Sequence, residues 1–174
     1  MAFAATTTEY TFEMHIDAPA NEVFPLLCPV RENDWVIGWE DAATLIHSQS
    51  GVAELGAVFQ TNHGDTPETW VITVHEADTH VAFARFDGNV VKRLVIDLKE
   101  QGGRTDMLWT TFQTGTSDVG NASIARTSEE AYRATYASLE TMLQHYLDTG
   151  EMISPEALHQ QACASPVRRR DLSG

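Results

Sequence analysis

The stretch Ala18–Trp39, APANEVFPLLCPVRENDWVIGW, decides the fold because it joins a strand to a proline-rich helical segment that ends in two tryptophans. Directly before it, residues 10–17 alternate between apolar and polar side chains, which is the period of a half-buried strand. Pro19 suits the first turn of a helix, where a backbone N–H has no helical partner. Two further prolines in the stretch predict that this helix is short or interrupted.

Six more strands are predicted between about Leu45 and Thr116, where short apolar runs alternate with turn signals. The clearest turns are Asp87-Gly88-Asn89 and Gln101-Gly102-Gly103. These connections are too short for crossovers between parallel strands, so the strands are expected to form an antiparallel meander.

The C-terminal third is expected to be mostly helical. Residues 115–126 indicate a loop, and Thr127 with Glu130 resembles a capping box that opens a long amphipathic helix. Gly150 is placed to end that helix, and Ser154 opens a further short helix in a tail over residues 151–174.

The predicted order is therefore β-αα-ββββββ-α, an α+β fold in which the long helix covers one face of the sheet. A strongly curved sheet of about seven strands is not filled completely by one helix. We therefore expect a cavity between the sheet and the C-terminal helix.

Two motifs in this order are suited to comparison: I-x-A-P-x-x-x-V-F at residues 16–24 and P-x-x-E-x-x-W-x-x-G-W at residues 29–39. With the order of elements, they resemble the START-like, or SRPBCC, superfamily over residues 8–149. The second motif is similar to a polyketide cyclase-like bacterial subgroup. The resemblance implies the helix-grip fold, one domain over residues 1–150 and a cavity for a hydrophobic ligand. Members include carriers, receptors and cyclases, so the fold alone does not select a function.

Charge and composition exclude several classes of partner. The 174 residues include 25 acidic and 11 basic side chains, a formal net charge of -14, and three of the basic ones are Arg168–Arg170 near the end. This charge disfavours nucleic acid and anionic membranes. No apolar run is long enough to insert into a membrane, and the two cysteines show no metal or disulfide spacing. We expect a cytoplasmic protein, with a homodimer left open.

The sequence predicts neither a metal site nor a cofactor. The seven histidines form no HxH or HExxH motif, and the GxSxG, GxGxxG and P-loop motifs are absent. His63 is the first candidate for acid–base catalysis, because the pKa of a histidine is close to neutrality.

Candidate ligand-binding residues are aromatic side chains on strands and on the long helix, together with polar groups on strands. Arg85 and His63 could orient a carboxylate or phenol, although a surface ion pair is an alternative for Arg85. Trp35 either gates the cavity or pins the helical segment to the sheet. The full set is Trp35, Phe59, His63, Trp70, Phe83, Arg85, Trp109, Phe112, Tyr132 and Tyr136.

The leading hypothesis is the binding of a small hydrophobic or aromatic molecule in the cavity. One alternative is an aromatase/cyclase-type enzyme that acts on a polyketide-like substrate. Another is a protein-interaction module, similar to cochaperones or toxins, which would show an exposed apolar patch and no internal cavity. The sequence does not decide whether the protein is an enzyme.

Overall fold

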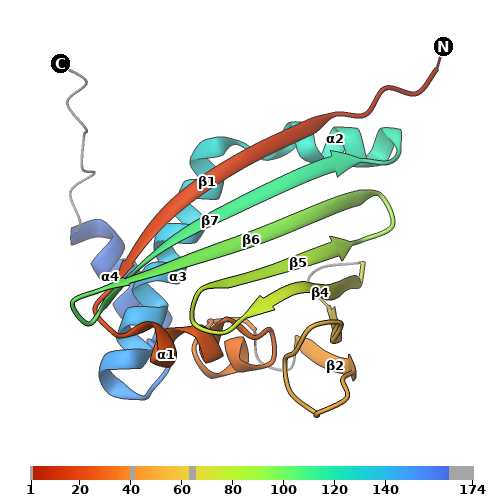
Figure 1. The fold of residues 1–174 in the computed structure, drawn as a ribbon. Helices are drawn as coiled ribbons and strands as arrows, with labels where there is room; N and C mark the ends of the chain where they lie inside the picture. Colours follow the sequence, from red (N-terminus) through yellow and green to blue (C-terminus); the bar gives the residue numbers. More distant parts are fainter. Residues whose placement is uncertain (1, 40–41, 63–65, 165–174) are drawn as a thin grey trace.

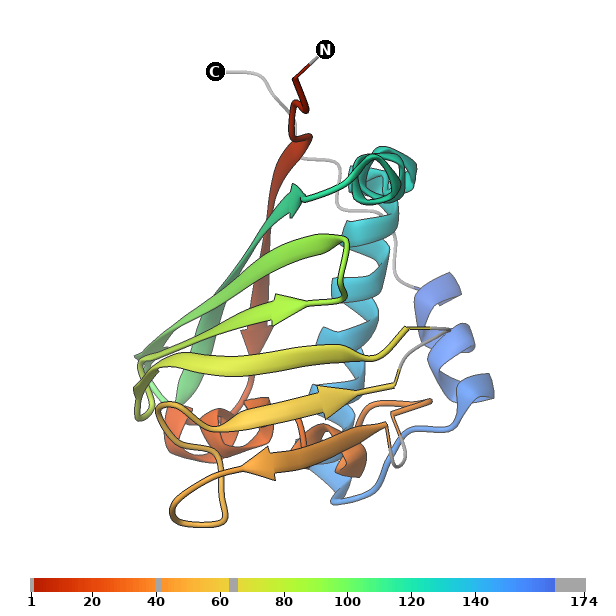
Figure 2. The same ribbon diagram turned by 90° about the vertical axis from the view of Figure 1, so that its right-hand side faces the viewer.

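One curved antiparallel sheet forms one side of the molecule, and helix α3 lies against it on the other (Figures 1 and 2). This computed structural model describes residues 2–39, 42–62 and 66–164. The strands are β1 (Thr7–Ile16), β2 (Ala43–His47), β3 (Val58–Thr61), β4 (Glu68–Glu76), β5 (His80–Phe86), β6 (Val90–Gln101) and β7 (Arg104–Gly115). The α-helices are α1 (Ala20–Val23), α2 (Asp118–Arg126), α3 (Glu129–Thr149) and α4 (Pro155–Ala164).

The predicted meander is confirmed. The strands lie in the order β1-β7-β6-β5-β4-β3-β2, so that within this sheet β1 and β7 are the one neighbouring pair that is distant in sequence, and β1 is the strand outside the meander. It pairs with β7 from Thr7 opposite Thr114 to Ile16 opposite Thr105. Gly102 and Gly103, in the turn between β6 and β7, have φ angles of +64° and +78°, a conformation that favours glycine.

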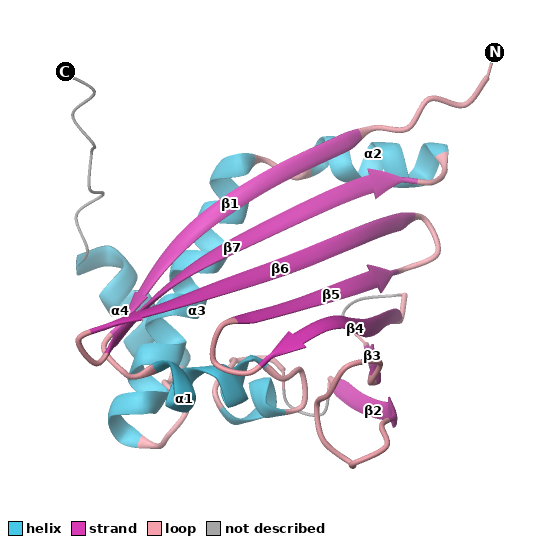
Figure 3. Ribbon diagram, viewed as in Figure 1, coloured by secondary structure: helices cyan, strands magenta, loops and turns pink. Residues whose placement is uncertain are grey.

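The decisive stretch forms the interrupted helix that its prolines predict. One α-helical turn, α1, runs directly into the 3₁₀ helix η1 (Phe24–Leu27), and a second 3₁₀ helix, η2 (Arg31–Asp34), follows. Pro19 precedes α1 as its N-cap. The backbone N–H of Ala20 donates to Glu100 Oε2 at 2.9 Å, which ties the start of α1 to the end of β6. Helix α1 therefore lies at this end of the sheet, and Figure 3 shows α2 at the other end.

The prediction of a loop over residues 115–126 is wrong, because Asp118–Arg126 form α2. Ser117 caps this helix, since its Oγ accepts a hydrogen bond from the Gly120 N–H at 3.1 Å. Gly120 packs directly against the backbone of Asn89, and Ile124 is buried. Contacts with the sheet therefore stabilise α2, whose sequence DVGNASIAR is short and contains only two large apolar side chains, Val119 and Ile124.

Helix α3 begins one residue later than predicted. Ser128, rather than Thr127, is the N-cap, and its Oγ accepts a hydrogen bond from the Ala131 N–H at 3.1 Å. Gly150 ends the helix with a φ of +73°, as predicted, and the predicted short helix of the tail is α4. Within the described ranges, no helix has both the length and the apolar character to span a membrane.

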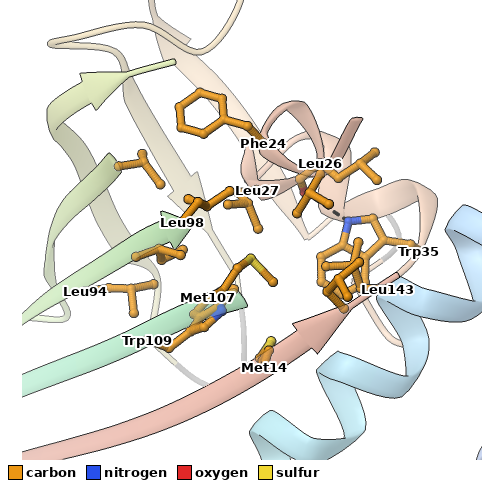
Figure 4. Close-up of a cluster of buried hydrophobic side chains, with 14 of the residues drawn as sticks. Met14, Phe24, Leu26, Leu27, Trp35, Leu94, Leu98, Met107, Trp109 and Leu143 are labelled. Atoms are coloured by element: carbon orange, nitrogen blue, oxygen red, sulfur yellow. Dashed lines mark hydrogen bonds between the residues drawn. The ribbon is translucent and has the colours of Figure 1, made fainter. Parts of the chain in front are cut away.

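The core lies between the concave face of the sheet and the covering helices. Figure 4 shows side chains of the decisive stretch, including Leu26, Leu27 and Trp35, opposite Met107 and other side chains of the strands. Leu143 approaches the same cluster from α3. The prediction that residues 10–17 form a half-buried strand is confirmed, since Met14 and Ile16 are fully buried in this core.

Candidate functional site

An apolar pocket of about 470 Å³ lies on the concave face of the sheet, against the segment from Phe24 to Arg31. Phe59, Ile72 and Phe83, from β3, β4 and β5, contribute its sheet side and are almost fully buried. Its volume is within the usual range for sites that bind small molecules.

The position of this pocket differs from the prediction of a cavity between the sheet and the C-terminal helix. Among the described residues, none from α3 lines it. Helix α3 packs against β1 at one edge of the sheet, whereas η1 and its flanking residues cover the other half. The sheet is wider than one helix, so the decisive stretch supplies the second cover.

A β-bulge brings a histidine into this pocket. The pairing of β4 with β5 shifts between Ile72 and Val74, which reverses the alternation of side chains beyond that point. His75 therefore lies on the pocket side, where its ring meets the Phe24 ring edge-to-face with the centroids 5.2 Å apart. Cys28 also lines the pocket, but burial raises the pKa of its thiol and keeps it protonated.

The loop between β2 and β3 forms part of the pocket wall through Gly51, Val52 and Ala53. Glu54 holds this loop, because its Oε1 accepts hydrogen bonds from Ser48 Oγ at 2.7 Å and from the Ser50 N–H at 2.9 Å. These bonds lower the pKa of Glu54 to about 2. The carboxylate therefore stays ionised, and the loop stays tied, across the neutral range.

Beside the pocket, the concave face becomes polar. The Arg85 guanidinium lies over the Trp70 ring at 3.5 Å, and its Nε donates to Glu68 Oε2 at 2.9 Å. Lys92 Nζ donates to the other oxygen of Glu68 at 2.8 Å. Glu68 is buried, so its carboxylate forms ion pairs with two cations, Arg85 and Lys92, in a partly dehydrated environment.

Two tyrosines of α3 face this polar part of the sheet. The hydroxyls of Tyr132 and Tyr136 lie 3.2 Å and 3.1 Å from Thr111 Oγ1. The Tyr136 ring meets the Trp109 ring edge-to-face at 5.3 Å. Burial raises the pKa of both tyrosines, so both remain neutral hydrogen-bonding groups.

Glu32 of η2 interacts electrostatically with the polar part of the sheet, through Arg85. The residue is half-buried, and burial raises the pKa of its carboxyl to about 8, although the nearby Arg85 lowers it. Glu32 and Arg85 also act on Tyr136, whose pKa the first raises and the second lowers. Glu32, Arg85 and Tyr136 therefore form one electrostatic group, with members from η2, β5 and α3.

No family model and no curated protein matches the sequence. Solved structures do match. An uncharacterised protein from Rhizobium leguminosarum superposes with a TM-score of 0.61 at 13% identity, over 83% of this chain and 97% of that one. Norcoclaurine synthase from Thalictrum flavum, in complex with dopamine and hydroxybenzaldehyde, gives 0.60 at 11% identity, over 83% and 89%. The Aha1 dimer from Colwellia psychrerythraea gives 0.57 at 12% identity, over 82% and 98%. This chain has the helix-grip fold.

The helix-grip fold confirms the architecture that the two motifs imply. At these low identities the similarity concerns the fold alone. Within the helix-grip fold, the apolar pocket and the polar group beside it are properties of this chain's own side chains.

The structure separates the predicted ligand-binding residues into several places. Phe59 and Phe83 line the apolar pocket. The polar part of the concave face holds Trp70, Arg85, Trp109, Tyr132 and Tyr136. The remaining aromatic residues of the set, Trp35 and Phe112, lie elsewhere.

Trp35 is 1% exposed and does not line the pocket; its Nε1 donates to the Leu26 carbonyl oxygen at 3.0 Å (Figure 4). Phe112 lies on the convex face under the Arg93 guanidinium, 5.8 Å from the ring, because it alternates with the inward-facing Trp109 and Thr111. His63 lies outside the described residues.

Sequence reasoning missed Glu32, Glu68 and Lys92. Strand alternation carried a signal for two of them, because Glu68 and Lys92 share a face with Ile72 and Leu94 on their own strands. Glu32 is the glutamate of the motif at residues 29–39, where it served as evidence for the fold rather than for the site. Among the residues that the structure describes, no three His, Cys, Asp or Glu side chains are arranged to hold a metal ion.

Proposed function

We propose that this protein binds a small, largely apolar or aromatic molecule in the pocket between strands β3–β5 and the Phe24–Arg31 segment. The observation that carries the proposal is the pocket itself, with about 470 Å³ and walls that include Phe59, Ile72 and Phe83. An apolar ligand in a pocket of this size would make dispersion contacts with the apolar side chains that line it.

The affinity follows from the apolar surface that a ligand would bury. A two-ring aromatic that buries about 250 Å² gains about 6 kcal/mol, which corresponds to a Kd on the order of 10⁻⁵ M. The neutral probe N-phenyl-1-naphthylamine, whose fluorescence rises in apolar surroundings, suits this measurement.

The test compares the parent with Ala53→Trp, which places an indole in the pocket from the loop that lines it. Val119→Trp is the matched control, because Val119 is 65% exposed on α2, outside the pocket. We expect saturable binding to the parent and the control, and at least about tenfold weaker binding to Ala53→Trp. Equal probe affinity in all three proteins, or no binding by the parent, would sink the proposal.

The pocket also argues against a protein-interaction module, since that alternative expects a filled interior. Large exposed apolar side chains do occur on the β2–β3 hairpin, at Ile46, Val52 and Leu55. Of these three, Val52 also lines the pocket wall, so the exposed apolar surface and the pocket occur together.

A second candidate is an enzyme of the cyclase type, and Glu32 is the observation that favours it. A carboxyl with a pKa of about 8 stays protonated at neutral pH and can serve as a general acid toward a carbonyl oxygen. Hydrogen–deuterium exchange at the methyl group of 2-acetylnaphthalene measures such activation without a known substrate: Glu32 would protonate the carbonyl oxygen while solvent removes a methyl proton, and return of a deuteron to that carbon completes the exchange. Faster exchange with the parent than with Glu32→Gln would support catalysis; equal rates would leave binding as the function.

A further inference from the structure

The polar part of the sheet adjoins the apolar pocket along β4 and β5. Ile72 of β4 and Phe83 of β5 line the pocket. Trp70 is two residues from Ile72 on β4, and Arg85 is two residues from Phe83 on β5, so both lie on the same face of the sheet as the pocket. The Trp70 and Phe83 rings are in edge-to-face contact at 5.7 Å. A ligand that extended from the pocket along β4 and β5 would therefore approach the Arg85 guanidinium.

The segment that covers the pocket also changes from pocket-lining residues to the polar group. Arg31 lines the pocket, and Glu32 follows it in η2. The charged or titratable groups that act on the Glu32 carboxyl are Arg85 from β5, Tyr136 from α3 and Cys28 at the end of η1. Within the described part of the chain, no hydrogen bond to this carboxyl occurs.

The side chains of this polar part carry more hydrogen-bond donors than acceptors. Among the residues that the structure describes, Glu68 is the one carboxylate bound to Arg85, and it also binds Lys92. Only Nε and one terminal nitrogen of Arg85 donate to Glu68, which leaves the other guanidinium N–H groups for a ligand. Glu32 is mainly protonated at neutral pH, because its pKa is about 8, and then adds an O–H donor. The arrangement therefore suits an oxygen anion.

We propose that Glu32 and Arg85, beside Tyr136, bind the carboxylate of an apolar carboxylic acid whose hydrocarbon part occupies the pocket. The proposal rests on the proposed function and specifies its ligand class. The guanidinium supplies the positive charge, and the protonated carboxyl donates a hydrogen bond to the second oxygen. Ionised Glu32 would repel the same ligand, so binding requires the proton to stay on Glu32.

The test uses two ligands of similar shape, 2-naphthoate and the neutral 2-methylnaphthalene, each measured by displacement of N-phenyl-1-naphthylamine. In the parent, naphthoate should bind about tenfold more weakly at about pH 9 than at about pH 7, because Glu32 must then take up a proton. The affinity for 2-methylnaphthalene should be the same at both pH values.

Glu32→Gln keeps a neutral donor at every pH. Its naphthoate affinity should match that of the parent at about pH 7 within about twofold and should not fall at about pH 9. Glu22→Gln is the charge-matched control, since Glu22 is exposed on α1, and it should keep the parent's pH dependence. Arg85→Lys, checked for folding by circular dichroism, should weaken naphthoate more than methylnaphthalene.

The two proposals fail in different ways. If neither the probe nor methylnaphthalene binds, the pocket is not a ligand site and the proposed function is overturned. If both bind, but the affinity for naphthoate is the same at both pH values or falls equally in Glu32→Gln, the carboxylate subsite is overturned and the apolar pocket stands.

Discussion

Replacement of Glu32 by glutamine should change how the stability of the folded protein depends on pH. The pKa of this carboxyl is about 8 in the folded chain, against an ordinary value of 4.5, and the main cause is burial. An acid whose pKa is raised by folding ionises first in the unfolded chain. Its contribution to stability is therefore complete below about pH 4.5 and is lost as the pH rises through about 8.

The magnitude follows from that interval. A pKa difference between 4.5 and about 8 corresponds to at most about 5 kcal/mol, since one pKa unit equals about 1.4 kcal/mol. Glu32 is only half-buried, and hydration of the carboxylate reduces this value. We expect Glu32→Gln to exceed the parent in free energy of unfolding by less than about 1 kcal/mol at about pH 5 and by about 3 kcal/mol at about pH 9.

Urea denaturation followed by tryptophan fluorescence measures this difference, because Trp35, Trp70 and Trp109 are buried. The comparison is between variant and parent at each pH, which cancels the titration of the other groups. Glu22→Gln controls for the loss of one negative charge at an exposed position. Parallel pH profiles for Glu32→Gln and the parent would refute the burial of an ionisable Glu32.

Three further substitutions test the supports of the fold. Trp35→Phe removes the indole N–H that binds the Leu26 carbonyl at 3.0 Å and should destabilise the protein by about 2 kcal/mol, measured in urea, while probe affinity changes less than about twofold. A large loss of affinity would instead support a gate. Gly120→Ala should cost about 2 kcal/mol in thermal unfolding, because its Cβ would collide with the Asn89 backbone; an unchanged Tm would contradict this packing. Ser128→Ala should cost about 1 kcal/mol by loss of the α3 cap, and a neutral result would place the cap elsewhere.

The elements that the sequence predicts well are those whose signal is local. The alternation in β1, the glycine turn between β6 and β7 and the proline breaks after Ala18 each depend on neighbouring residues alone. Helix α2 was missed because it is stabilised by contact with Asn89, a residue distant in sequence. Local patterns carry no information about such contacts.

The site was predicted in part for the same reason. The inward faces of Phe59 and Phe83 follow from strand alternation, and both line the pocket. The bulge that turns His75 inward has no clear sequence signal, and the electrostatic effect of Arg85 on Glu32 joins residues from β5 and η2 that are distant in sequence. The raised pKa of Glu32 therefore follows only from the three-dimensional structure.

The central claim is that the pocket between strands β3–β5 and η1 receives an apolar molecule. Methyl NMR of the parent protein, titrated with 2-methylnaphthalene, tests it most directly. The methyl signals of Leu27, Ile72 and Val81, which line the pocket, should shift and saturate together, while those of the exposed Leu108 and Val119 stay unchanged. Shifts confined to Leu108 and Val119, or no shift at any of the five, would contradict the account.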